Sequence, residues 1–240
     1  GQLASFVRLG VLGDWNNPYK TMDFSSEANI IRALSKIIDN DHLQKGAKPV
    51  HWCTDCGSAL AEAEVEYHDK VSPATDVMFT AVDSDAVAGN FSELDAGKGE
   101  GDVSFVIWTT TPWTLVGNTA VAVNPNLTYV KAKVGNEIYY LAKGTLHILK
   151  DYEIVEKIKG KNLVGLEYTG PFADIELQKG ITTKIISWKE VEETQGTGIV
   201  HIAPGCGEAD NVLGREFNLS TIIPITDEGF YTKGIGSRVK

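Results

Sequence analysis

The predicted fold depends on one stretch, Phe105-Val-Ile-Trp-Thr-Thr-Thr-Pro-Trp-Thr-Leu-Val-Gly-Asn118. All residues of 103–108 except Ser104 are β-branched or aromatic, a composition typical of a strand buried on both faces. Pro112 has no N–H to donate to a sheet, so we expect the strand to end within Thr109–Thr111. Three hydroxyls are thereby presented at the end of a strand, where they can bind a polar substrate or a water. A threonine-rich edge strand without a function is the competing interpretation.

Short strands and turn residues flank this stretch on both sides. Residues 61–67 alternate small or apolar side chains with Glu, which predicts a strand. Gly135-Asn136 predicts a hairpin turn between strands at 127–134 and 137–142. Further elements are expected as strands at 76–82, 119–123, 154–158, 162–168, 181–191 and 199–202, a polar loop at 90–102 and a short helix at 144–151. Many short strands with few helices indicate a closed or nearly closed β-barrel.

The first part of the chain reads differently. Residues 1–24 are expected to be irregular or short-helical, and apolar residues at helical spacing predict an amphipathic helix over 26–40. A short strand at 49–52 leads into Cys53-Thr-Asp-Cys56-Gly57, a turn in which two thiolates can hold one metal ion. Tetrahedral zinc needs four ligands, and Cys206 and five scattered histidines offer no matching pair. A reduced turn without metal is therefore the favoured interpretation.

The composition excludes several classes of protein. The 240 residues are 42% hydrophobic and 22% charged, as in an ordinary globular protein. The net charge of −10 excludes the basic stripe of a protein that holds long nucleic acids. No apolar run reaches the roughly 20 residues of a membrane span, and no signal-peptide pattern occurs. Three cysteines make no disulfide framework. We expect a cytoplasmic, monomeric fragment of a longer chain without a membrane partner.

A second block, residues 196–210, contains the remaining candidate groups. Gly196 and Gly198 permit close backbone approach, and His201 lies in a predicted strand between Val200 and Ile202. Residues 208–217 resume helical spacing, so Asp210 falls in the first turn of a helix, where the helix dipole favours a carboxylate. Each residue has an ordinary structural explanation when it is taken alone: a satisfied core histidine and a helix-start acid.

Together, the two blocks resemble the signature stretches of the editing domain of isoleucyl-tRNA synthetase, the bacterial type most closely. Supporting stretches occur along the whole chain: Gly10-Val-Leu-Gly-Asp-Trp15, Pro18-Tyr19, Thr21-Met-Asp-Phe24, Pro49-Val-His-Trp-Cys-Thr-Asp-Cys56 and Ala59-Leu-Ala-Glu-Ala-Glu-Val-Glu-Tyr67. Valyl and leucyl editing domains carry a Thr-Thr-Arg-Pro type block where this chain has Thr110-Thr-Pro-Trp113. The sequence departs from the bacterial pattern at Cys206 and at Val116-Gly117.

The resemblance implies a fold that is α+β but mainly β, an editing β-barrel with short peripheral helices preceded by a helical segment of the class I catalytic domain. It implies four parts: the tail of the first half of that catalytic domain (1–47), a Cys-x-x-Cys stalk (48–59), the editing barrel (60–230) and the start of a return linker (231–240). The ATP-binding signatures His-Ile-Gly-His and Lys-Met-Ser-Lys-Ser are absent from this sequence. We therefore expect no amino-acid activation or tRNA charging by the fragment.

The implied reaction is hydrolysis, by a positioned water, of the ester in valyl-tRNA(Ile). A pocket for isoleucine cannot strongly exclude valine, because one methylene contributes only about 1–3 kcal/mol of binding free energy. Isoleucyl-tRNA synthetase is itself the standard example of this limit. Asp210 would bind the α-ammonium of valine and take part in catalysis, and His201 would exclude the extra methyl of isoleucine. Thr109, Thr110 and Thr111 would hold the ester and the water. Trp113 and Asn118 would position the terminal adenosine.

The implied partners are the acceptor end of tRNA(Ile) carrying valine and the rest of the synthetase in cis. Editing would need no cofactor; ATP and Mg²⁺ belong to the absent catalytic domain, and zinc at Cys53 and Cys56 is an option for the full-length protein. Three alternatives remain: a valyl- or leucyl-type editing domain, a tRNA-docking zinc-ribbon module without catalysis, and a free-standing trans-editing protein. Trp113 argues against the first, the lone Cys-x-x-Cys against the second, and residues 1–47 against the third.

Overall fold

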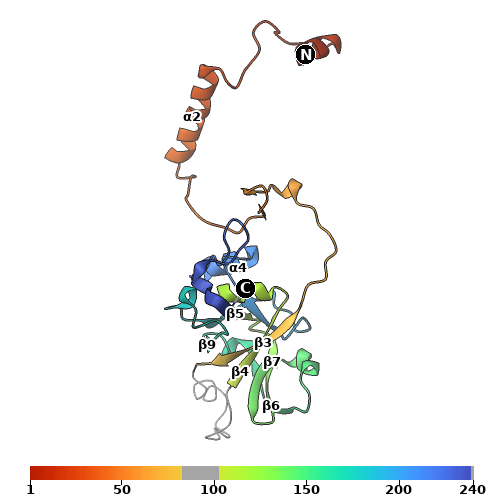
Figure 1. Ribbon diagram of the computed structural model, residues 1–240, viewed down its shortest axis with the longest axis vertical. Helices are drawn as coiled ribbons and strands as arrows, with labels where there is room; N and C mark the ends of the chain where they lie inside the picture. Colours follow the sequence, from red (N-terminus) through yellow and green to blue (C-terminus); the bar gives the residue numbers. More distant parts are fainter. Residues whose placement is uncertain (83–102, 239–240) are drawn as a thin grey trace. The chain divides into compact units, whose positions relative to one another are not determined.

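A computed structural model describes residues 1–82 and 103–238 of the chain. These residues form two compact units, Gly1–Ala47 and Lys48–Lys240 (Figure 1). The polar loop expected at 90–102 lies outside the described residues. Within the part of the chain that the structure describes, no helix is long and apolar enough to cross a membrane.

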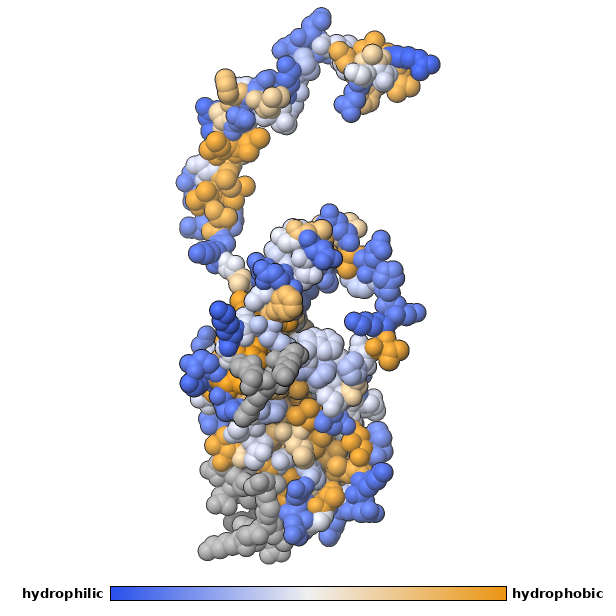
Figure 2. Space-filling view, in the orientation of Figure 1, coloured by the Kyte–Doolittle hydropathy of each residue, from blue (hydrophilic) through white to orange (hydrophobic). Residues whose placement is uncertain are grey.

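The first unit contains two helices, α1 (Gln2–Arg8) and α2 (Phe24–Asp39). The amphipathic helix expected over 26–40 is thus confirmed, with its start two residues earlier, after Asp23 in extended conformation. Hydrophobic residues run along α2 in the space-filling view (Figure 2). Six large ones are exposed: Phe24, Ile30, Ile31, Leu34, Ile37 and Ile38. The apolar face that the spacing predicted is therefore present on α2.

The second unit begins with the Cys-x-x-Cys segment. Strands β1 (Trp52–Cys53) and β2 (Ser58–Ala59) pair antiparallel around it, and Gly57 takes a φ of 62° in the turn. The strand predicted at 61–67 is wrong. A 3₁₀ turn, η1 (Glu62–Glu64), forms instead, because the Glu64 carboxylate accepts the Ala61 N–H at 2.8 Å. Ala and Glu favour helical turns over strands, so this local bond outweighs the alternation.

A nine-stranded mixed sheet forms the rest of the unit, a half-barrel with short helices. Its order is β10-β5-β11-β4-β7-β6-β8, with β3 paired to β4 and β9 to β3. The strands span β3 Thr75–Ala81, β4 Val103–Thr109, β5 Ala120–Val123, β6 Thr128–Val134, β7 Glu137–Ala142, β8 Glu153–Lys159, β9 Tyr168–Thr169, β10 Lys184–Ser187 and β11 Ile199–Ile202. Most of the predicted strands, including the hairpin at Gly135-Asn136, are confirmed (Figure 1).

Three predicted strands are much shorter in the structure. The one expected at 49–52 is reduced to β1, which begins only at Trp52. The segment expected at 162–168 forms the 3₁₀ turn η4 (Gly160–Asn162) and then a bend, and only β9 remains extended. Gly165 interrupts it at a φ of 92° and donates its N–H to the Ile185 carbonyl. The segment expected at 181–191 contributes only β10, which pairs parallel with β5. Apolar residues outside these strands fill the core from loops.

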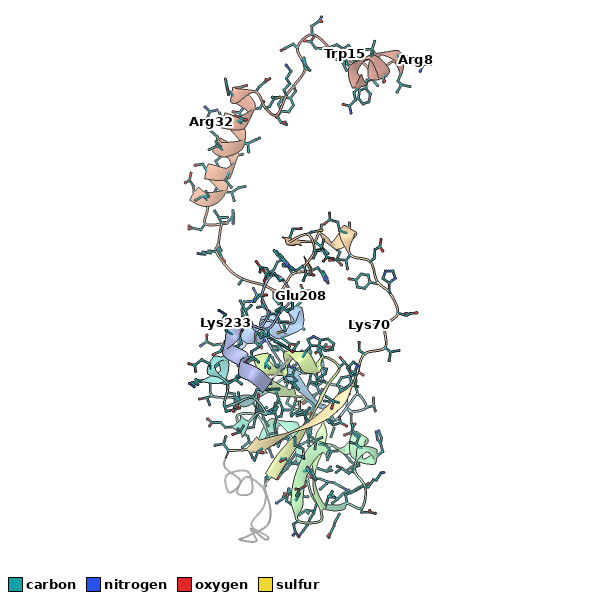
Figure 3. All side chains as sticks on the ribbon, in the orientation of Figure 1. Arg8, Trp15, Arg32, Lys70, Glu208 and Lys233 are labelled. Atoms are coloured by element: carbon teal, nitrogen blue, oxygen red, sulfur yellow. The ribbon has the colours of Figure 1, made fainter. Side chains whose placement is uncertain are left out.

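The remaining helical elements are short. The helix expected at 144–151 is the 3₁₀ turn η3 (Lys143–Ile148), and the one expected at 208–217 is α4 (Glu208–Glu216). Three further 3₁₀ turns are η2 (Pro112–Gly117), η5 (Glu176–Gln178) and η6 (Lys233–Arg238). Glu208 begins α4 (Figure 3).

Strand β4 lies at the centre of the sheet and is buried on both faces, as its composition predicted. Along one edge it pairs antiparallel with β3. Its other edge is shared: residues 103–105 pair with β7, and Trp108 pairs with Val200 of β11. The rings of Phe105 and Tyr140 meet in the core at a centroid distance of 5.7 Å. The central strand thus anchors the two segments that carry the predicted site residues.

Candidate functional site

The strand register brings the two blocks of the sequence together. Trp108 of β4 lies opposite Val200 of β11 in parallel register, so both chains run toward the same end of the sheet. Thr109–Thr111 follow Trp108, and His201 follows Val200. Gly196 takes a φ of 59°, and a Cβ there would lie 2.2 Å from Trp108 Cγ. Only glycine allows this contact, which fixes the Trp108 ring in place.

A cavity of about 310 Å³ opens where the two blocks meet. We call it the front pocket. Threonines and glycine, two tryptophans, and ionisable groups share its wall: Trp108, Thr109, Thr110, Thr111, Trp113, Thr114, Val200, His201, Cys206, Gly207 and Asp210. The structure therefore gathers all but one of the predicted catalytic and substrate-binding residues in one cavity.

The threonines form a hydrogen-bonded ladder along the wall. Thr109 is buried, and its Oγ1 accepts the Thr111 N–H at 3.1 Å and lies 3.4 Å from Thr111 Oγ1. Thr114 Oγ1 donates to the Thr111 carbonyl at 2.8 Å. Thr110 is exposed. Pro112 begins η2 at this point, so the chain turns and holds the ladder across the strand end.

His201 is 6% exposed and has a partner at each ring nitrogen. Its Nε2 lies 3.0 Å from Thr114 Oγ1, and its Nδ1 lies 2.8 Å from Asn118 Nδ2. The side chain thus contacts the front pocket on one side and Asn118 on the other.

The directions of these bonds follow from the Asn118 amide. Its Nδ2 lies 2.8 Å from the Ala120 carbonyl, which can only accept, so the nitrogen must face that side. The same nitrogen then donates to His201 Nδ1, which must be unprotonated. His201 therefore carries its proton on Nε2 and donates it to Thr114 Oγ1, whose own hydrogen goes to the Thr111 carbonyl.

Burial lowers the pKa of His201 to about 4, although its contact with Thr114 opposes the shift. The imidazole is therefore neutral at physiological pH. Since Nδ1 already accepts a hydrogen bond and Nε2 donates one, His201 has no lone pair free to act as a general base.

Asp210 lies in the first turn of α4, as predicted. Its Oδ2 accepts the Ala203 N–H at 2.8 Å. Among the described residues, the carboxylate makes this one hydrogen bond, through Oδ2. Its Oδ1 is therefore left for a ligand in the front pocket. Burial raises the pKa of Asp210, and the Ala203 N–H opposes that shift. A partly desolvated carboxylate is well suited to bind a cation.

Trp113 and Asn118 were both expected to position the terminal adenosine, and the structure places them at different cavities. Trp113 is 44% exposed and lines the front pocket, and its carbonyl accepts the Tyr231 hydroxyl at 2.9 Å. Asn118 is 3% exposed and does not line that pocket. It lies behind His201, whose Nδ1 is 2.8 Å from Asn118 Nδ2, and its role at the adenosine stays a prediction.

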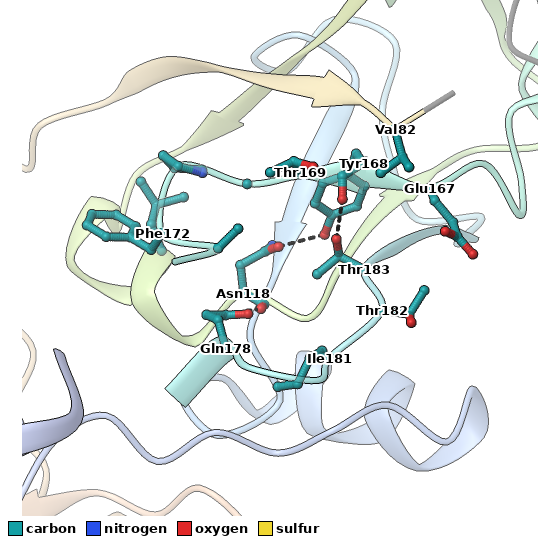
Figure 4. A pocket seen from close by; sticks show the side chains of 14 residues that line it. Val82, Asn118, Glu167, Tyr168, Thr169, Phe172, Gln178, Ile181, Thr182 and Thr183 are labelled. Atoms are coloured by element: carbon teal, nitrogen blue, oxygen red, sulfur yellow. Dashed lines mark hydrogen bonds between the residues drawn. The ribbon is translucent and has the colours of Figure 1, made fainter. Parts of the chain in front are cut away.

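A second cavity, of about 220 Å³, lies on the Asn118 side (Figure 4). We call it the back pocket; its walls include Asn118, Tyr168, Gln178 and Thr183, with Glu167 and Phe172. The Tyr168 hydroxyl donates to Asn118 Oδ1 at 2.6 Å, and Gln178 Nε2 donates to the Asn118 carbonyl at 2.9 Å. Asn118 therefore lines the back pocket and is linked to the front pocket through His201.

The two departures from the bacterial pattern lie close together. A Cβ at Gly117 would lie 3.5 Å from Cys206 Sγ, which is ordinary van der Waals contact. Burial, with Asp210 nearby, raises the pKa of the Cys206 thiol to about 11. The thiol is therefore protonated at neutral pH and is no activated nucleophile.

Cys53 and Cys56 lie outside both cavities. The Cys56 N–H points at Cys53 Sγ, with the nitrogen 3.3 Å from the sulfur, and this bond lowers the pKa of Cys53. In residues 1–82 and 103–238, no group of three or more histidine, cysteine or acidic side chains could hold a metal ion. Two thiols do not complete a tetrahedral zinc site.

Sequence reasoning assigned no role to three residues that support the site: Thr114, Tyr168 and Gln178. Thr114 had a usable signal, because it follows Thr111 by three residues in a turn opened by proline and so faces it. Tyr168 and Gln178 had none. Their contacts with Asn118 span 50 and 60 residues of chain.

Comparison with solved structures defines the class of fold. The chain is similar to the crystal structure of GlLeuRS-CP1, with a TM-score of 0.52, 16% sequence identity and coverage of 60% of each chain. It is similar to the P. knowlesi cytosolic leucyl-tRNA synthetase editing domain, with a TM-score of 0.50, 16% identity and coverage of 60% of this chain and 64% of that one. The chain thus has the fold of synthetase editing domains and spans less than two thirds of these structures.

The family follows from the sequence itself. The family model of the class I tRNA synthetases (I, L, M and V) matches residues 2–220. The chain belongs to the class I tRNA synthetases.

Proposed function

We propose that the front pocket is an editing site that hydrolyses the ester of valyl-tRNA(Ile). One observation carries the proposal: the threonine ladder, the neutral His201 and the carboxylate of Asp210 share a single cavity. Family membership supports the partners, the tRNA acceptor end and the other synthetase domains in cis. The specificity for isoleucine tRNA rests on the sequence signature at Thr110-Thr-Pro-Trp113.

Asp210 would bind the α-ammonium group of the misplaced amino acid. A charge-assisted hydrogen bond of this kind is about twice as strong as a neutral one and distinguishes a free amine from a blocked one. The carboxylate is held by the Ala203 N–H at 2.8 Å, so it is oriented before the substrate arrives. The ester would then lie within reach of the threonine hydroxyls.

Thr109, Thr110 and Thr111 would hold the ester and orient a water for attack. Catalysis would rest on positioning and on hydrogen bonds to the developing oxyanion. His201 and Cys206 would not remove the proton, since both nitrogens of His201 are engaged and the Cys206 thiol has a pKa of about 11. The ribose hydroxyl of the substrate is the remaining candidate for proton transfer.

His201 would set the size limit of the pocket. Its ring is held at both nitrogens, so it forms a wall that cannot rotate away from an extra methyl group. Trp113, exposed at the same cavity, would stack on the terminal adenine. No role in the reaction is proposed for Cys53 and Cys56.

A leucyl-type substrate is the second candidate, because the similar solved structures are leucyl-tRNA synthetase editing domains. The two candidates differ in the ester that is hydrolysed and in the ester that is spared. An isoleucyl-type site spares isoleucyl-tRNA(Ile), whereas a leucyl-type site spares leucyl-tRNA(Leu) and acts on smaller or isomeric residues carried by that tRNA.

Deacylation of the matched and mismatched esters on both tRNAs tests the proposal. Low salt and high protein concentration are needed, because a chain of net charge −10 binds nucleic acid weakly and affinity falls steeply with salt. Selective release of valine from tRNA(Ile) is expected. Selective action on tRNA(Leu) would favour the second candidate, and release of no amino acid from either would contradict a deacylase in this chain.

A further inference from the structure

A tyrosine in the back pocket reaches His201 through a single intermediate residue. Tyr168 of β9 is 2% exposed, and its ring packs against Phe79 at a centroid distance of 5.1 Å. Its hydroxyl donates to Asn118 Oδ1 at 2.6 Å, the contact drawn in Figure 4. The ring is thus held by packing, and the hydroxyl is directed at Asn118, with the Thr183 side chain as a further hydrogen-bond partner.

Asn118 has little hydrogen-bonding capacity left. Its two amide hydrogens go to the Ala120 carbonyl and to His201 Nδ1, both at 2.8 Å. Its Oδ1 accepts from Tyr168, which among the described residues is the donor at that oxygen. The orientation of the amide is therefore fixed: Oδ1 faces the Tyr168 hydroxyl, and Nδ2 consequently faces His201.

A chain of hydrogen bonds with a single direction results. It runs from the Tyr168 hydroxyl to Asn118, from Asn118 to His201 Nδ1, and from His201 Nε2 to Thr114. Thr114 then donates to the Thr111 carbonyl at 2.8 Å. The chain begins in the back pocket and ends on the threonine ladder of the front pocket.

We propose that Tyr168 is a positioning residue for the size filter: through Asn118 it holds His201 in the Nε2–H form that faces Thr114. The proposal rests on the proposed function, in which His201 excludes isoleucine. Without the hydroxyl, Asn118 Oδ1 would be buried and unpaired, a state that proteins avoid. The amide would then swing toward other partners, and His201 would lose its fixed tautomer and orientation.

The test compares Tyr168→Phe with Tyr129→Phe in this chain. Tyr129 is the matched control, because it is fully buried and its hydroxyl also makes buried bonds, donating to the Gly198 carbonyl at 2.8 Å and accepting the Asn124 N–H at 3.0 Å. Both variants lose one hydroxyl and keep the ring. Thermal unfolding should show comparable losses of stability.

The first measurement is independent of activity. Long-range ¹H–¹⁵N spectra of histidine-labelled protein report the tautomer, and His201→Gln identifies the His201 signals. The unsubstituted chain and Tyr129→Phe should show His201 in the Nε2–H form alone, and Tyr168→Phe should show a mixture. The second measurement is the ratio of valyl- to isoleucyl-tRNA(Ile) hydrolysis, which should fall about tenfold in Tyr168→Phe and stay unchanged in Tyr129→Phe.

The outcomes separate the positioning role from the proposed function. An unchanged His201 signature in Tyr168→Phe, or equal loss of discrimination in both variants, would overturn the proposal. If Tyr168→Phe alters the His201 tautomer but the unsubstituted chain has no deacylase activity, the positioning role of Tyr168 is supported and the editing function is refuted. Asn118→Asp provides an independent check: a carboxylate at that place can only accept, so it should reverse His201 to the Nδ1–H form.

Discussion

The front and back pockets lie on either side of Asn118 and differ in how their polar groups are used. In the front pocket, Asp210 is bonded through one oxygen, and Thr110 is exposed. In the back pocket, Tyr168 and Gln178 direct their donors at Asn118. The front pocket therefore has hydrogen-bonding capacity for a substrate, whereas two polar side chains of the back pocket bind Asn118, the partner of His201.

This difference suggests separate roles for the two pockets: the front pocket would bind the reacting ester, and the back pocket would support the front-pocket residues. In the proposed reaction a water held by hydrogen bonds attacks the ester, so the rate depends on the geometry of the residues that hold it. We expect substitutions in the front pocket to change the rate itself. Substitutions behind it should change which ester is accepted.

The largest effect is expected for Asp210→Asn. The α-ammonium would lose its charged partner, and kcat/KM for valyl-tRNA(Ile) should fall about 100-fold. The amide oxygen can still accept the Ala203 N–H, so the melting temperature at neutral pH should be equal or higher, since a desolvated charge is removed. Undiminished turnover would end the assignment of Asp210 to the substrate amine.

Protonation of Asp210 at low pH should lower the deacylation rate and raise the stability of the fold. Because burial raises the pKa of Asp210 above the 3.8 of an ordinary aspartate, its charge is lost at a higher pH as the solution is acidified. Deacylation should fall through that raised pKa, up to tenfold per pH unit below it. A raised folded pKa means that protonation favours the folded state, so the stability gap between Asp210→Asn and the unsubstituted chain should narrow as pH falls. A widening gap would contradict the burial of this charge.

His201→Ala should affect discrimination more than rate. Removing the ring opens space for the additional methyl group, so isoleucyl-tRNA(Ile) should become a substrate and the ratio of valyl to isoleucyl hydrolysis should drop about tenfold. Parallel deacylation assays on the two esters measure this ratio. Continued protection of isoleucyl-tRNA(Ile) would show that another group sets the size limit.

The smallest effect is expected for Cys206→Ala. The thiol touches the space left by Gly117 and is protonated at neutral pH, so its loss should change kcat/KM by less than about twofold. The double variant Gly117→Ala/Cys206→Ala measures whether the added methyl group fills the same space. A large loss of activity in Cys206→Ala would indicate a chemical role for the thiol.

The sequence predicted the parts of the fold that are fixed by local pattern. The apolar run ending at Pro112 predicted a doubly buried strand, and the alternating segments around Gly135-Asn136 predicted a hairpin. Both predictions are confirmed, because a buried strand and a hairpin turn are each determined by the residue types within a few positions. At 61–67 the same reasoning failed, since a local cap from Glu64 competes with an alternation that no neighbouring strand among the described residues reinforces.

The site was predictable to the extent that its groups lie in two short blocks. Thr109–Thr111, Trp113, His201 and Asp210 line one cavity as the signature implied, although their roles remain predictions. Asn118 could not be placed from its spacing, because the turn after Pro112 directs it away from Trp113 and behind His201. Tyr168 lies 50 residues from its partner Asn118, a contact that only the folded sheet creates.

The most direct test of the account is to locate a bound substrate analogue. Adenosine carrying valine through a 3′-amide cannot be hydrolysed, and its binding can be followed in amide NMR spectra of the labelled chain. We expect shifts concentrated at Thr109–Thr111, His201 and Asp210, with smaller changes at Tyr168. Shifts concentrated at Thr169 and Thr183 instead would place the ligand in the back pocket and contradict the assignment of the front pocket as the editing site.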